Sequence, residues 1–98
     1  MNEMDILDLF YDELRAEGQT RETLFISLDE SALTKLNKKL SVDVPIEVLH
    51  KLADICIANE WLERTTIDPG YNYLSLTEAG LKLAVHYQYT RRQKIKKS

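Results

Sequence analysis

Apolar residues at the start of the chain recur with the period of an α-helix. One stripe at spacing i, i+3, i+4 and i+7 consists of Leu7, Phe10, Tyr11 and Leu14. Acidic residues in the first turns suit the positive end of a helix dipole, and Gly18 is a typical stop. The pattern therefore predicts a first helix that ends at Gly18.

Three further apolar residues, Met4, Ile6 and Leu9, lie beside or off this stripe. They either widen the face that packs into the core or form a second contact surface with another subunit. We expect the second arrangement, together with Leu83 and Tyr87 of the last helix, to give a two-fold homodimer in which one patch meets itself.

A short segment and a second helix follow. Thr23–Leu28 is rich in residues that favour strands, which predicts a small strand. Ser27 and Glu30 then match the S-x-x-E capping box, with Asp29 as a competing N-cap. The inner side of the second helix is predicted to carry Ala32, Leu33, Leu36 and Leu40.

The third helix is predicted over Ile46–Glu60, and Pro45 fits the first helical position, where its missing N–H loses no hydrogen bond. Ser41–Val44 is the preceding turn, in which Asp43 can cap. The inward residues of this helix are expected to be Leu49, Leu52, Ala53 and Cys56. A helix, a short turn and a helix make a helix-turn-helix.

Two strand-like segments, Trp61–Ile67 and Tyr73–Leu76, come next and predict a hairpin. The connection 68–72 contains Pro69 and Gly70, which allow the chain to reverse.

The last helix is expected to begin with Thr77 as its N-cap. Gly80 inside it costs about 1 kcal/mol relative to alanine. Leu81, Ala84 and Val85 are expected to pack on the body, while a second stripe contains Leu83 and Tyr87.

The predicted fold is mainly α with a small β-hairpin, an α+β arrangement of helix, strand, helix, helix, hairpin and helix. Residues 1–89 are expected to form one domain, and residues 90–98 a basic C-terminal tail.

Two segments give this order a resemblance to winged-helix transcription regulators. LHKLADICIANEWLER is similar to the family's L-x-x-L-x-x-x-G-L-I exit from the recognition helix, although Glu60 and Trp61 stand where glycine and leucine are usual. YLSLTEAGLKLA is similar to its Y-x-L-T-x-x-G segment after the wing. The resemblance implies that the third helix enters the major groove of DNA and that the hairpin, or wing, touches the phosphate backbone.

Composition narrows the class of protein. Ninety-eight residues, 44% of them hydrophobic, suit a single domain with a real core. Cys56 is the only cysteine, which excludes an internal disulfide and suits a reducing compartment. The acidic start is unlike a signal peptide and no apolar run is long enough for a membrane span, so we expect a cytoplasmic protein without a membrane partner. No catalytic, cofactor or metal motif occurs, and we expect no enzyme activity.

Charge is distributed unevenly along the chain. Residues 1–30 hold nine acids against two bases, whereas residues 82–98 hold six bases and no acid. Either the basic end is a solvated tail, or it contacts nucleic acid or an acidic partner. Helix 3 and the wing tip, by contrast, offer few bases, and Asp43 and Glu47 would repel phosphate.

These features leave two functions open. The first is a DNA-binding transcription regulator that binds double-stranded DNA, and the second is an acidic winged-helix module that binds a protein partner without DNA. The candidate nucleic-acid-binding residues are Lys35, Lys38, Lys39, His50, Lys51, Arg64, Tyr71, Asn72, Arg91, Arg92 and Lys94.

Overall fold

The structure is a computed structural model that describes residues 1–67 and 70–97, with side chains described up to residue 90. Four helices and a two-stranded antiparallel hairpin make up the fold, which is compatible with a winged helix. The elements, in chain order, are α1 (Glu3–Glu17), α2 (Glu30–Leu40), α3 (Ile46–Ala58), β1 (Leu62–Arg64), β2 (Leu74–Leu76) and α4 (Glu78–Lys97). The predicted mainly α fold with a small hairpin is therefore confirmed.

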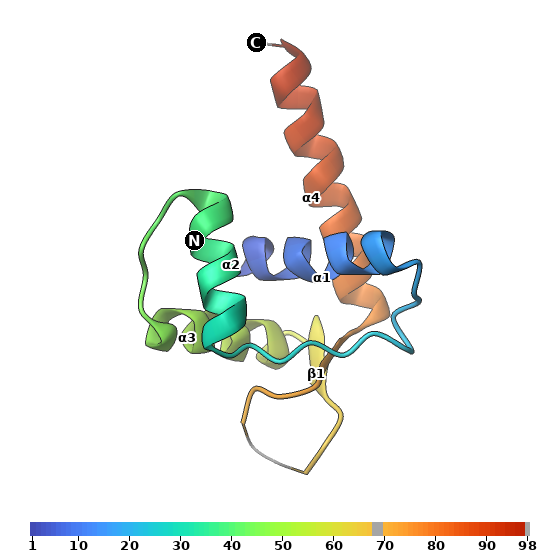
Figure 1. Cartoon of the computed structure of the whole chain (residues 1–98). Coiled ribbons are helices and arrows are strands. Elements are labelled where there is room, and N and C mark those ends of the chain that lie inside the picture. Colours follow the sequence, from blue (N-terminus) through green and yellow to red (C-terminus); the bar gives the residue numbers. More distant parts are fainter. Residues whose placement is uncertain (68–69, 98) are drawn as a thin grey trace.

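Helix α1 is the centre of the molecule. Figure 1 shows it crossing the middle, with α3 below it and with α2 and α4 towards its two ends. Six consecutive residues, Asp5–Phe10, are buried, so this part of the helix is covered on all sides rather than along one stripe. Ile6 and Leu9 consequently belong to the core of this chain and are not available as a dimer surface.

Both ends of α1 are capped by residues next to them in the sequence. Asn2 and Asp5 form a capping box, in which each side chain accepts a hydrogen bond from the other residue's backbone N–H. Gly18 ends the helix at φ 62°, a left-handed conformation that favours glycine, as predicted.

The predicted strand Thr23–Leu28 is wrong in extent. Only Ile26 pairs, as an isolated bridge to Leu74 of β2. The α2 cap is Asp29, whose side chain accepts from the Ala32 N–H. Ser27, the first residue of the predicted capping box, is used elsewhere, because its hydroxyl accepts from the Tyr73 N–H.

Helix α3 begins at Ile46, as predicted, and ends at Ala58, two residues before the predicted end at Glu60. Pro45 is the N-cap and Ile46 the first helical residue, and Asp43 does not cap, since the helix has no side-chain cap bond. The preceding turn is held by Asn37, whose side-chain amide makes hydrogen bonds of 3.1 and 3.2 Å with the backbone of Val44.

The chain leaves α3 through a left-handed residue. Glu60, at the position where the winged-helix pattern has glycine, has φ 59° and an exposed side chain. A residue with a Cβ pays a steric cost in this conformation. The departure from the pattern therefore changes the residue but not the backbone geometry that the turn needs.

The hairpin is shorter than predicted. Leu62 pairs with Leu76 and Arg64 with Leu74, and the strands end there. Residues 65–67 and 70–73 belong to the loop, where Tyr73 has φ 54° and Ile67 is fully exposed. The predicted turn residues 68 and 69 lie outside the described part of the chain.

The start of α4 is tied to the end of α3. Thr77 accepts a hydrogen bond from the Gly80 N–H, which confirms it as the N-cap, and its hydroxyl donates to the Glu60 carbonyl at 2.6 Å. A Cβ on Gly80 would lie 2.1 Å from the Trp61 carbonyl oxygen. Glycine is therefore present because α4 passes close to the backbone that precedes β1.

Further along α4, Ala84 and Gln88 are buried against the body. Leu83, assigned to a second stripe, packs partly against the core, and Val85, expected to pack, is 42% exposed. The reason is that α4 meets α1 along a narrow stripe and then leaves the body, as Figure 1 shows.

We predict that Gly80→Ala lowers the free energy of unfolding by about 2–3 kcal/mol, because overpacking against a fixed backbone outweighs the helix propensity of alanine. Gly18→Ala is the control, since its Cβ meets nothing and only the positive φ costs about 1 kcal/mol. Urea unfolding followed by circular dichroism measures both. A Gly80→Ala protein as stable as the wild type would contradict the close approach.

We predict the opposite sign for Glu60→Gly, which should raise the free energy of unfolding by about 0.5–1 kcal/mol by relieving the left-handed conformation. The neighbouring control Ala58→Gly, at the end of α3, should lower it by about 0.5–1 kcal/mol. If both glycines destabilise the protein equally in urea, Glu60 is not strained.

Candidate nucleic-acid interface

Four side chains meet where α3 faces the wing loop. The rings of His50 and Tyr71 stack with centroids 3.9 Å apart and planes 12° from parallel. The Tyr71 hydroxyl donates to the Asp54 carboxylate at 3.0 Å, and Arg64 lies near both, with its guanidinium 4.0 Å from Asp54. The structure thus brings together three predicted site residues, His50, Arg64 and Tyr71, around an acid.

The polar groups of this cluster are already engaged within the chain. His50 Nε2 makes a hydrogen bond of 2.9 Å to the Leu28 carbonyl, and Arg64 Nε donates to the Gly70 carbonyl. Partial burial, followed by the hydrogen bond to Asp54 and its charge, raises the pKa of Tyr71 above its ordinary value. The phenol therefore stays a neutral donor that fixes the wing loop to α3.

Two predicted residues beside the cluster are exposed. Lys51 on α3 and Asn72 in the wing loop face solvent. Lys51 forms no ion pair with any residue that the structure describes. The face formed by α3 and the wing still carries the exposed acids Glu47 and Asp54, so it offers little positive potential.

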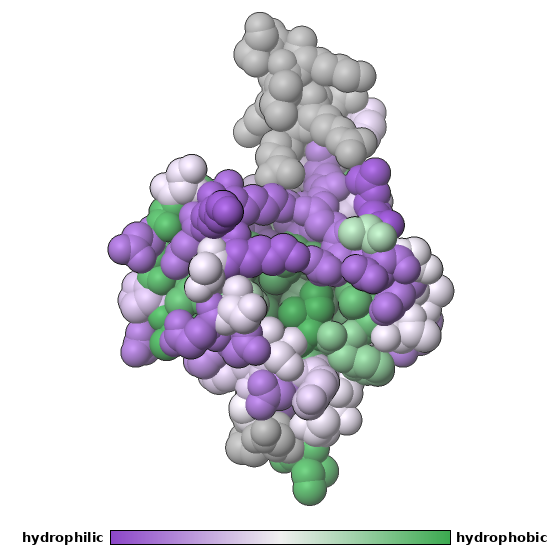
Figure 2. All heavy atoms as spheres, viewed as in Figure 1, coloured by the Kyte–Doolittle hydropathy of each residue, from purple (hydrophilic) through white to green (hydrophobic). Residues whose placement is uncertain are grey.

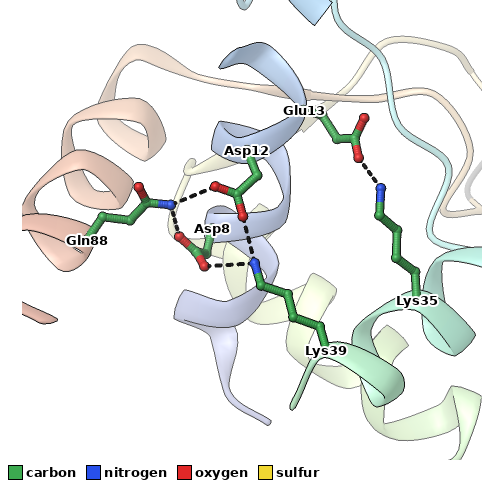
Figure 3. Close-up of polar contacts among 6 residues, drawn as sticks. All are labelled: Asp8, Asp12, Glu13, Lys35, Lys39 and Gln88. Carbon is green, nitrogen blue, oxygen red and sulfur yellow. Dashed lines mark hydrogen bonds and ion pairs between the residues drawn. The ribbon is translucent and has the colours of Figure 1, made fainter. Parts of the chain in front are cut away.

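The lysines of α2 turn towards α1 and its acids. Figure 3 shows Lys35 reaching Glu13, and Lys39 reaching both Asp8 and Asp12. Lys39 Nζ lies 2.6 Å from Asp12 and 3.3 Å from Asp8, whose side chain is only 3% exposed. Lys38 is exposed, and the structure shows no ion pair for it among the described residues.

The network continues into α4. Gln88 donates from its side-chain amide to both Asp8 and Asp12, at 3.0 Å in the case of Asp12. Partial burial works against the charge of Lys39, but the hydrogen bond to Asp12 and the two carboxylate charges outweigh it and raise the pKa of Lys39. Lys39 thus links α2 to the two acids of α1 that also bind Gln88 of α4, and these acids balance its charge.

The remaining candidates, Arg91, Arg92 and Lys94, belong to the last turns of α4, and their side chains lie outside the described part. Figure 1 shows this end of α4 pointing away from α3 and the wing loop. The structure therefore separates the candidates into three groups: the α3–wing cluster, the α2 lysines and the α4 end.

Sequence reasoning missed Asp8, Asp54 and Gln88 as structural partners. Gln88 follows Leu81 and Ala84 at helical spacing, so its place on the inner stripe was a usable signal. Asp8 interrupts the apolar run of α1, which is also a signal for a buried acid with a partner.

Cys56 is buried in the core, as expected. Burial, followed by the charge of Glu3, raises the pKa of its thiol to about 12, which keeps it protonated. Within the residues described, no group of three or more histidine, cysteine or acidic side chains could hold a metal ion. None of the helices in the same part of the chain combines the length and the apolar character needed to cross a bilayer.

Comparison with known proteins gives no relative: no family model, no curated protein and no solved structure matches the chain.

We predict that Lys39→Met lowers the free energy of unfolding by about 2 kcal/mol, because it removes the cation from a buried carboxylate. Lys35→Met is the matched control on the same helix. Its pair with Glu13 is more exposed, so the loss should stay within about 0.5 kcal/mol. If both variants lose the same free energy of unfolding in urea, the contact of Lys39 with Asp8 stabilises the protein no more than an exposed ion pair does.

Proposed function

We propose that the protein is a winged-helix transcription regulator that binds double-stranded DNA chiefly through the basic end of α4. The observation that carries this proposal is the charge distribution. All six bases of residues 82–98 stand on or at the end of one helix, without an acid among them, and five of them lie beyond Thr90. Positive charge of this density favours phosphate contact and counterion release.

The architecture supports the winged-helix part of the proposal. Three helices precede a hairpin and one follows it, and Ile26 bridges to β2 on the side away from β1. This places a strand-like residue, β2 and β1 side by side, as a small three-membered sheet next to α3.

The contact is proposed for α4 rather than α3 because three of the five candidate cations outside α4 are paired with acids. Lys35 and Lys39 pair with acids of α1, and Arg64 lies against Asp54. Because α3 and the wing face away from the end of α4 in Figure 1, one straight duplex would not meet both at once. We therefore expect modest sequence preference, with Lys51 and Asn72 in secondary roles.

The homodimer expected from the sequence is retained in this proposal, with α4 as its contact. Ile6 and Leu9 are excluded because they are buried, whereas Val85 and Tyr89 on α4 are 42% and 62% exposed.

A second candidate function is a protein-interaction module that has no DNA contact. It is favoured by the exposed acids Glu47 and Asp54 on α3, the helix that would otherwise read bases.

We predict that a DNA titration will show a steep salt dependence for the intact chain. Three to five phosphate contacts give a slope of log K against log salt of about −3 to −4.5, so affinity should fall roughly 40- to 500-fold between 50 and 200 mM salt. Cutting the chain after Tyr89 should abolish most of the binding while the helical circular dichroism of the body survives.

A charge variant separates the loss of cations from the loss of helix. It replaces with glutamine Arg91, Arg92, Lys94, Lys96 and Lys97. This full-length variant should bind as weakly as the truncated chain, and Lys51→Gln should change affinity much less. Equal affinity of the intact and charge-variant chains would refute the α4 mechanism. No binding by the intact chain at low salt would favour the protein-interaction module.

A further inference from the structure

The segment that precedes α2 uses one of its two backbone edges. The N–H and carbonyl of Ile26 both bond to Leu74 at 2.9 Å, and the Leu28 N–H donates to the Tyr71 carbonyl at 2.8 Å. Ile26 and Leu28 are two positions apart, the spacing of residues whose backbone groups point to the same edge of an extended strand. Residues 26–28 therefore run as the outer member of the small sheet.

The other edge of this segment is open. In an extended chain the backbone groups of Phe25 and Ser27 point away from those of Ile26 and Leu28. Within the described residues, neither the N–H nor the carbonyl of Phe25 or Ser27 has a hydrogen-bond partner. Two donors and two acceptors thus remain for another strand.

A groove lined by both apolar and polar residues includes this segment. It has a volume of about 370 Å³ and is lined by parts of α1, α2 and the segment itself. The apolar residues that line it are Leu9, Phe25, Ile26 and Ala32. Figure 2 shows a hollow with apolar residues at the middle of this face, beneath a band of hydrophilic residues.

Charge at the groove is negative. Lys35 lines it, but its charge is matched by Glu13 on the same rim. Asp29 also lines the groove, and Glu30 beside it is exposed. The charged side chains that line the groove are thus two acids, Glu13 and Asp29, and one base, Lys35.

We propose that this groove binds an extended peptide by strand addition, and that the peptide alternates basic with aliphatic side chains. Its backbone would pair with Phe25 and Ser27, its aliphatic side chains would enter the groove between Leu9 and Ala32, and its bases would face the acids at the start of α2. About five residues of such a peptide span roughly 16 Å. This partner is additional to DNA, because the groove contains no residue of α4.

The test uses the intact chain labelled with nitrogen-15 and a capped peptide of alternating lysine and valine, about seven residues long. We expect saturable shifts of the Phe25 and Ser27 amide signals. The same peptide with N-methyl groups on the backbone amides of its pairing edge keeps its charge and side chains, and should bind at least tenfold more weakly. Phe25→Ala should reduce affinity several-fold, whereas Val42→Ala, at another exposed apolar residue that does not line the groove, should not.

Three results would overturn the proposal. The first is equal affinity of the N-methylated peptide, which would leave only charge attraction. The second is a set of shifts confined to other parts of the chain. The third is a concentration-dependent shift of the same two amides without peptide, together with dimers in sedimentation, which would assign the edge to a second copy of this chain.

Discussion

The fold depends on the burial of one carboxylate. Asp8 stands in the middle of the central helix, and a buried charge is tolerated only with a cation and hydrogen bonds around it. Lys39 supplies the cation from α2, and Gln88 supplies an amide from α4. These contacts fix the rotation of α1 about its axis, because the side of α1 that carries Asp8 must face both Lys39 and Gln88.

A second constraint orders the other half of the molecule. The carbonyl of Trp61 accepts from the Thr77 N–H, and the same oxygen stands where a side chain on Gly80 would lie. The end of α3, the base of the hairpin and the first turn of α4 are therefore packed backbone against backbone. Changes of side-chain rotamer cannot relieve such contacts, so they hold the base of the hairpin in one position against α4.

Helix positions could be predicted from the sequence because apolar spacing records which face is buried. The exact caps could not, since Ser27 and Asp29 offer the same chemistry two residues apart, and only the Tyr73 N–H decides which one is free. The surroundings of the candidate interface residues could be predicted even less well from the sequence. A sequence shows that Lys35 and Lys39 are basic, but whether they face solvent or the acids of α1 depends on how two helices pack. Likewise, Tyr71 and Asp54 are seventeen positions apart and meet only once the wing folds over α3.

The pairing of Asp8 with Gln88 also bears on how the protein is made. Eighty residues separate the two side chains, so nearly the whole chain must be available before the central helix can be covered. During synthesis α1 leaves the ribosome before α4, which covers it. Contacts of such long range slow the folding search, because the chain must close a long loop before the contact forms. Until then the apolar faces of α1 remain accessible to chaperones or to α1 helices of neighbouring nascent chains.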